Sequence, residues 1–198
     1  MPKSNVLNKV VGYQEAVKAK EELAKTGSDF TDQKWATART IAKLHPKRLT
    51  LEVSEIIDET ETTKTFRFVS TNGFLPPFQA GQYINLFVTI DGVETARPYA
   101  VSSSPLQREY YDVTVKRVAE GFVSHYLLDR LEVGQQLHST GPMGTFYHNP
   151  VFHGQDLVFL AGGSGIAPAM SMIKDVLERK LPYQFHFIYA SSYVDDVI

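Results

Sequence analysis

The spacing of apolar residues changes twice along this chain of 198 residues. Residues 13–25 and 31–44 have the composition and spacing of helices. From residue 49 the apolar residues alternate with a period of two, and after residue 150 an apolar strand, a helix and a second apolar strand follow one another. The pattern predicts a helical extension over residues 1–48, a β domain over 49–150 and a βαβ unit over 151–198.

The β domain is expected to be built from short strands. The sequence predicts strands at 49–53, 65–69, 83–90, 93–102, 110–118 and 135–140, and one helix at 123–131. Asp91 and Gly92 form a strong hairpin signal between the third and fourth strands. Six short strands with one helical interruption predict an antiparallel, Greek-key-like β barrel rather than a parallel sheet.

Composition excludes several classes of protein. There are no cysteines, which excludes disulfides and cysteine-bound iron–sulfur clusters within this chain. The net charge of −2 gives no electrostatic case for nucleic-acid binding, and the six histidines show no metal-ligand spacing. Neither a long apolar run nor a signal-peptide core is present, so we expect no membrane span and a cytoplasmic location.

Charge is distributed unevenly along the sequence. Residues 1–48 hold ten Lys or Arg and five Asp or Glu, whereas residues 49–198 hold ten and seventeen. We interpret the basic arm as a solvated helical extension folded on the body, with docking to an acidic partner as the alternative.

Residues 97–105 place a cation, an aromatic ring and a run of hydroxyls on one strand. Arg97 and Tyr99 lie two positions apart, so their side chains leave the same face of the strand. A guanidinium binds phosphate and a phenol ring lies against flat heterocycles, so this face fits the edge of a dinucleotide. An exposed arginine beside a half-buried tyrosine is the purely structural alternative.

Two glycine-containing turns follow further along the chain. Residues 121–124, Gly-Phe-Val-Ser, open a helix whose first N–H groups and dipole would face an anion. Residues 162–165, Gly-Gly-Ser-Gly, connect an apolar strand to the next helix. Their spacing differs from the Gly-x-Gly-x-x-Gly fingerprint of Rossmann dehydrogenases. Both turns are predicted to bind phosphate, with an ordinary helix start at 121–124 and a purely structural turn at 162–165 as the alternatives.

In this order, the three segments resemble the ferredoxin-reductase family of FAD- and NAD(P)-binding oxidoreductases. Residues 97–100 match its Arg-x-Tyr-Ser motif, except that Ala100 replaces the serine. Residues 121–124 resemble its Gly-x-x-Ser flavin-phosphate turn, residues 141–146 its Gly-Pro-x-Gly-x-Phe segment and residues 160–168 its nicotinamide-nucleotide turn. The resemblance covers residues 49–198.

The resemblance implies hydride transfer from NAD(P)H to FAD, followed by electron transfer to an acceptor such as an iron–sulfur protein. It places Tyr99 and Ala100 at the isoalloxazine as catalytic positions. Ala100 would offer only its backbone N–H near the flavin N5, with Ser102 as a candidate replacement hydroxyl. The implied cofactor-binding residues are Arg97, Pro98, Tyr99, Ala100, Val115, Lys116, Gly121, Phe122, Val123, Ser124, Gly162, Gly163, Gly165 and Ile166.

Several alternatives remain open at this point. Two phosphate anchors favour FAD over FMN, and residues 191–196, with two acids and no cation, favour NADH over NADPH. One βαβ unit is less than a doubly wound nucleotide domain needs, so we expect a fragment or one piece of a split protein. The chain could instead be a non-catalytic flavin-binding electron-transfer or regulatory subunit, or a scaffold module with an empty barrel.

Overall fold

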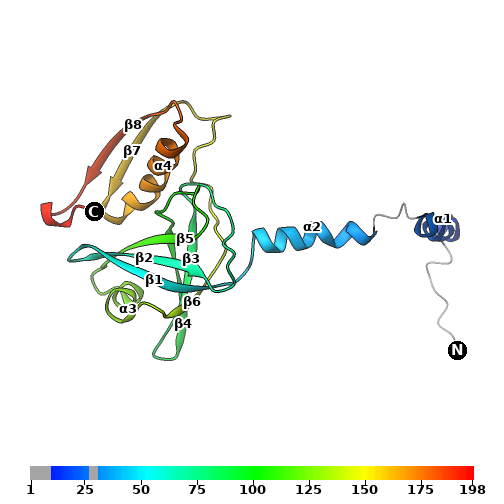
Figure 1. The fold of residues 1–198 in the computed structure, drawn as a ribbon, viewed down its shortest axis with the longest axis horizontal. Helices are drawn as coiled ribbons and strands as arrows, with labels where there is room; N and C mark the ends of the chain where they lie inside the picture. The colour runs from blue at the N-terminus through cyan, green and yellow to red at the C-terminus, as the bar shows by residue number, and fades with distance from the viewer. Residues whose placement is uncertain (1–9, 27–30) are drawn as a thin grey trace. The chain divides into compact units, whose positions relative to one another are not determined.

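A computed structural model describes residues 10–26 and 31–198. The chain divides into two compact units, Met1–Lys43 and Leu44–Ile198. The predicted helices are present as α1 (Tyr13–Thr26) and α2 (Thr31–Leu44) (Figure 1). None of the helices in the described residues has both the length and the apolar character that crossing a bilayer requires.

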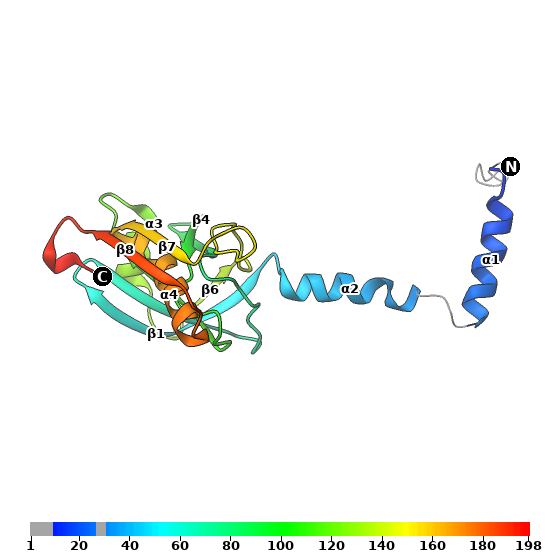
Figure 2. The same cartoon turned by 90° about the horizontal axis from the view of Figure 1, so that it is seen from above.

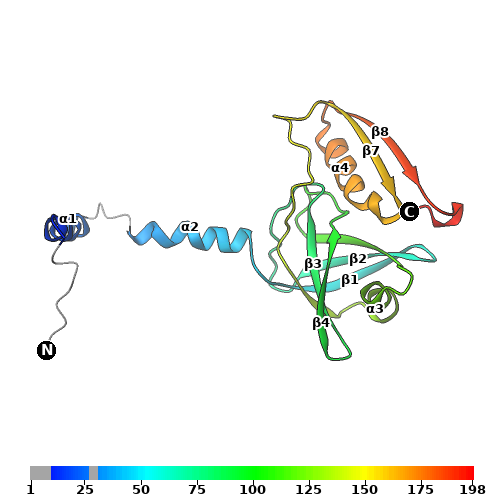
Figure 3. The same cartoon turned by 180° about the vertical axis from the view of Figure 1, so that it is seen from behind.

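The second unit contains the predicted six-stranded antiparallel sheet (Figures 1 and 3). Its strands are β1 (Leu49–Thr60), β2 (Thr63–Ser70), β3 (Tyr83–Ile90), β4 (Val93–Ala100), β5 (Tyr110–Lys116) and β6 (Gln136–Ser139). They are ordered β4-β3-β6-β1-β2-β5. Just past the end of β4, Val101 forms an isolated bridge with Val113 of β5, and the described residues form no continuous ladder between these outer strands. The sheet therefore curls as a barrel does, but its hydrogen-bonded ladder is not closed.

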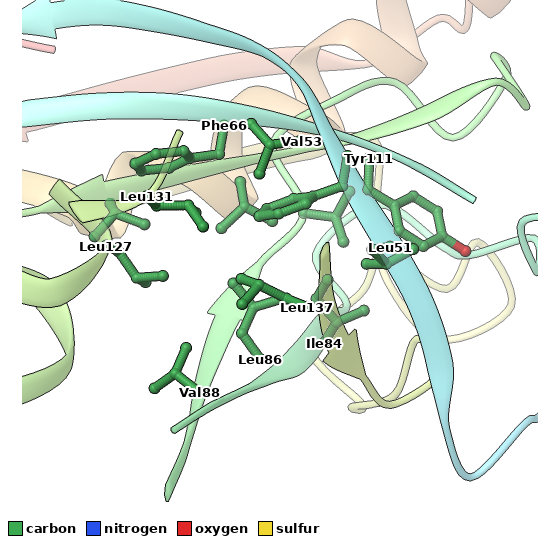
Figure 4. Close-up of a cluster of buried hydrophobic side chains, with 14 of the residues drawn as sticks. Leu51, Val53, Phe66, Ile84, Leu86, Val88, Tyr111, Leu127, Leu131 and Leu137 are labelled. Carbon is green, nitrogen blue, oxygen red and sulfur yellow. The ribbon is translucent and has the colours of Figure 1, made fainter. Parts of the chain in front are cut away.

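Alternating side chains of this sheet form the core. Leu51, Phe66, Leu86 and Val113 are at most 1% exposed, each on a different strand. Figure 4 labels Leu51, Phe66 and Leu86 in this cluster, together with Leu127 of helix α3 (Phe122–Arg130). Burial of these apolar surfaces is the main driving force for forming the sheet.

A polar ion pair ties β2 to β5 outside this core. Arg67 donates from Nε and Nη2 to the two carboxylate oxygens of Asp112 at 2.9 and 3.1 Å. Its guanidinium also lies 3.9 Å from the centre of the Tyr110 ring. Two parallel charge-assisted bonds fix the register of these neighbouring strands.

The predicted βαβ unit consists of β7 (Asp156–Gly162), α4 (Ile166–Arg179) and β8 (Gln184–Ala190). The short helix η2 (Gly163–Gly165) lies between β7 and α4, and a second short helix, η3 (Val194–Asp196), follows β8. Strands β7 and β8 are parallel, and Figure 2 shows α4 alongside them. The outward face of this pair is apolar, with Val158, Leu160 and Ile188 more than 60% exposed.

Helix α4 joins the barrel through a seam of polar contacts. Ser171 donates to the carbonyl oxygen of Ser103 at 2.8 Å, and Lys174 donates to that of Ser102 at 2.9 Å. The hydroxyl of Ser104 donates to Glu178. The three serines at 102–104 therefore all contact α4. These contacts explain why the three residues are buried.

Candidate functional site

Strand β4 carries the predicted cation and ring on one face. Arg97 is exposed, and its Nη1 donates to Thr95 Oγ1 at 3.2 Å and to the carbonyl oxygen of Ala96 at 2.8 Å. The ion pairs found in residues 10–26 and 31–198 do not include Arg97. Its charge is therefore free to meet an anionic ligand. Pro98, between the two residues, is exposed.

Tyr99 is half-buried and packs against the barrel core. Burial raises the pKa of its phenol to about 12, and the positive charge of Arg97 opposes part of that rise. The phenol is thus neutral at physiological pH. A neutral ring with one packed face and one accessible face can support a flat heterocycle.

The backbone around Ala100 leaves one N–H directed away from the β3 ladder. The Val101 N–H donates to the carbonyl oxygen of Gln82 beside β3, and the Ser102 N–H donates to Asp112 on β5. Backbone groups alternate in direction along a strand, so the Ala100 N–H points to the β5 side. There the ladder is limited to the Val101–Val113 bridge. The role of the Ala100 N–H toward a ligand stays a prediction.

Ser102 cannot replace the missing serine hydroxyl in this arrangement. Its side chain is buried, with Oγ 3.2 Å from the carbonyl oxygen of Asp112 and 3.0 Å from Thr114 Oγ1. These partners hold the hydroxyl between β4 and β5. The suggestion that Ser102 compensates for Ala100 was wrong, because alternation along a strand does not reveal cross-strand partners.

The 121–124 turn has the geometry that the sequence predicted. Gly121 precedes α3, and Ser124 Oγ accepts the Val118 N–H at 3.2 Å and donates to the Gly121 carbonyl oxygen at 3.3 Å. The Ser124 hydroxyl thus shapes the turn, while the first N–H groups of α3 have no partner within the helix. A hollow lined by Asp91, Gly121, Phe122 and His125 opens at this point.

The 162–165 turn lies against the end of β5. Gly163 has a φ of +50°, and its carbonyl oxygen accepts the Tyr189 hydroxyl at 3.1 Å. A Cβ added to Gly163 would lie 3.7 Å from both Cδ and Nζ of Lys116. The fold therefore brings two predicted residues, 47 positions apart in the sequence, side by side.

Three residues implied by the resemblance point into the protein. The side chains of Val115, Val123 and Ile166 are 1%, 3% and 6% exposed. They can contribute only backbone groups to a ligand, because their side chains fill the protein interior. Gly162, Gly165 and Phe122 are exposed and accessible.

Sequence reasoning missed the partners of Lys116. Its Nζ forms an ion pair with the carboxylate of Asp196, which also accepts hydroxyls from Thr62 at 2.5 Å and Thr60 at 3.2 Å. Asp196 was noted in the sequence only as an acid that bears on the choice of nucleotide. No local pattern links it to Lys116, because 80 residues separate them.

Comparison with known proteins gives a family match over the barrel. Residues 50–148 match the family model described as "Oxidoreductase FAD-binding domain". The glycine betaine monooxygenase reductase subunit of Pseudomonas aeruginosa is 34% identical over 169 residues, covering 85% of this chain and 43% of that protein. The ferredoxin reductase component of 3-ketosteroid-9-alpha-monooxygenase of Mycobacterium tuberculosis is 36% identical over 138 residues, covering 65% and 38%. The chain thus spans less than half the length of these relatives.

Solved structures show the same fold. The flavohem-like FAD/NAD binding domain of nitric oxide dioxygenase from Vibrio cholerae has a TM-score of 0.69 and 25% identity, covering 75% of this chain and 64% of that chain. Phthalate dioxygenase reductase has a TM-score of 0.68 and 23% identity, covering 76% and 46%. Both alignments extend beyond the residues matched by the family model.

Proposed function

Because this chain belongs to the oxidoreductase FAD-binding domain family, we propose that it binds FAD and forms part of an NAD(P)H-dependent flavoprotein reductase. Residues 49–150 form the FAD-binding part in this proposal, and residues 151–198 form part of the pyridine-nucleotide site. The electrons pass to an acceptor such as an iron–sulfur protein. The names of the oxygenase reductase relatives support this direction of transfer.

The observation that carries the proposal is the ligand-ready face of β4. Arg97 is an exposed cation outside the ion pairs of the described residues, Tyr99 presents a neutral ring, and the Ala100 N–H points away from the β3 ladder. These groups suit a phosphate, an aromatic ring and a hydrogen-bond acceptor of one ligand. FAD contains all three, so the residues fit the group that the family binds.

Each residue has a distinct task in this proposal. Arg97 and the first N–H groups of α3 hold phosphate, Tyr99 supports the ring and keeps water from it, and the Ala100 N–H orients it. Gly163 and Gly165 let the backbone approach the nicotinamide nucleotide. Bound FAD would supply the capacity to accept a hydride and to release single electrons.

The finer points of the proposal concern the partner, the nucleotide and the location. We propose NADH as the preferred nucleotide, since residues 191–196 carry acids and no cation. We also propose a cytoplasmic location and an electron acceptor with an iron–sulfur centre. A non-catalytic flavin-binding subunit would share the flavin site and lack reduction by NADH.

The first test is the absorption spectrum of the purified chain before and after FAD is added, with chromatography of the flavin released by denaturation. We expect bands at about 375 and 450 nm, which are typical of oxidised flavin, and release of FAD. Release of FMN alone would contradict the choice of FAD. A chain that retains no flavin after FAD is added and the unbound flavin is removed would contradict the flavoprotein proposal and favour the scaffold interpretation.

A further inference from the structure

The carboxylate of Asp196 forms an ion pair with Lys116, a cation that lies beside the proposed nucleotide turn. Both of its oxygens are engaged, one by Lys116 and the other by Thr60 and Thr62. The Lys116 and Asp196 side chains are 20% and 16% exposed, so solvent screens the pair only in part. Figures 1 and 2 show the C-terminal segment beside the β1–β2 hairpin that carries the threonines.

Lys116 also stands where a phosphate at the 162–165 turn would need a positive charge. A Cβ on Gly163 would be 3.7 Å from Lys116 Nζ, so the ammonium group lies directly beside the turn backbone. Glycine at this position lets a ligand approach the same backbone closely. An ammonium group has several donors but one charge, so a carboxylate and a phosphate compete for it.

We propose that Asp196 is an internal competitor for the phosphate groups of the pyridine nucleotide, and that releasing Lys116 from Asp196 is a step in nucleotide binding. This proposal rests on the proposed function of the 162–165 turn. In this proposal Asp196 lowers the affinity for the pyridine nucleotide. From the sequence, its place after the second strand of the βαβ unit bore only on the preference for NADH over NADPH.

The hydrogen bonds of Thr60 and Thr62 favour the state in which Lys116 is released from Asp196. They hold the carboxylate in place when Lys116 turns away, so Asp196 keeps partners after it releases the ammonium group. Lys116 in turn gains the phosphate. The exchange leaves neither charge without a partner, which keeps its free-energy cost small.

Calorimetric titration of the FAD-treated chain with NAD+, which cannot reduce the flavin, and with ADP-ribose tests this proposal. We expect Asp196→Asn to tighten binding of both ligands by about fivefold, the size of one partly exposed charge-assisted bond. The control is Asp195→Asn, which makes the same charge change at the exposed neighbouring residue. We expect that variant to tighten binding by less than about twofold.

A second variant separates competition from loss of structure. Thr62→Val keeps the charge of Asp196 but removes a hydrogen bond that the carboxylate retains after release, so it should weaken nucleotide binding, opposite in sign to Asp196→Asn. In the Asp196→Asn background, Lys116→Met should abolish the gain.

The outcomes distinguish this proposal from the proposed function. If the wild type binds the ligands and Asp196→Asn, Thr62→Val and Asp195→Asn bind them with the same affinity, the competition is overturned while the proposed function stands. Weaker binding in Asp196→Asn would show that the contact supports the site, and would also overturn it. Absence of binding to every form, at millimolar ligand, would remove the proposed nucleotide site and this proposal with it.

Discussion

Arg97 is the residue on which the proposed flavin site depends most directly. We expect Arg97→Ala to weaken FAD binding by about tenfold or more, because the phosphate loses a charge-assisted hydrogen bond. Fluorescence titration with FAD measures this change. Arg179→Ala is the matched control, since Arg179 on α4 is partly exposed and pairs with Asp175 within its own helix at 2.6 Å. Equal affinity in the two variants would count against the site.

Tyr99 gives the site a pH dependence that can be checked without ligand. Its pKa of about 12 lies above the ordinary value of about 10, so the folded state favours the neutral phenol. This contribution to the free energy of unfolding is complete below about pH 10 and is lost as the pH rises through 12. We expect urea denaturation at pH 8 and 11 to show a smaller loss for Tyr99→Phe than for the wild type. Equal losses would contradict the raised pKa.

At the scale of elements, the start of α3 depends on the absence of a side chain at Gly121. A Cβ there would lie 2.8 Å from Val118 Cβ and 2.9 Å from the Val118 carbonyl oxygen. We expect Gly121→Ala to lower the free energy of unfolding by about 1–3 kcal/mol and to weaken FAD binding. Denaturant titration and FAD titration measure the two effects.

Gly154→Ala is the matched control for this substitution. Gly154 lies in a loop, and a Cβ there would meet no atom within 4 Å. We expect no change in either titration beyond about 0.5 kcal/mol. Loss of stability without loss of FAD affinity in Gly121→Ala would show that the turn is structural only.

The sequence predicted most elements because their apolar residues have a clear period. Strand β3 was predicted at its observed bounds, since four of its residues alternate into the core. Strand β1 was predicted only to residue 53, although it continues to Thr60. Its second half is largely exposed and polar, so it carries no alternation signal, and pairing with β2 is what extends it.

The candidate site could be predicted only where its parts are local in sequence. The turns at 121–124 and 162–165 were recognised because a glycine-rich segment followed by a helix has a local signature. The cross-strand partners of Ser102 and the pairing of Lys116 with Asp196 depend on how distant segments meet. Packing of the whole unit sets such contacts, and no short pattern encodes them.

At the scale of the molecule, the seam between α4 and the barrel is held largely by backbone carbonyls of residues 102 and 103. We expect Lys174→Met to loosen this seam, because it removes a charged donor. Hydrogen exchange of α4 amides should rise at least about threefold, while β2 and β5 stay protected. Lys180→Met, at the exposed C-cap of α4, is the control. Faster exchange throughout the barrel would contradict a separable seam.

The open face of β7 and β8 also bears on how the purified chain behaves in storage. The exposed apolar side chains of Val158, Leu160 and Ile188 favour association between molecules. Each of the two strands also has one edge that pairs with no other strand in the described part of the chain. A net charge of −2 provides little long-range repulsion between molecules. Light scattering should therefore increase with protein concentration. Leu160→Lys should suppress that increase, because it replaces an exposed apolar side chain with a hydrated charge.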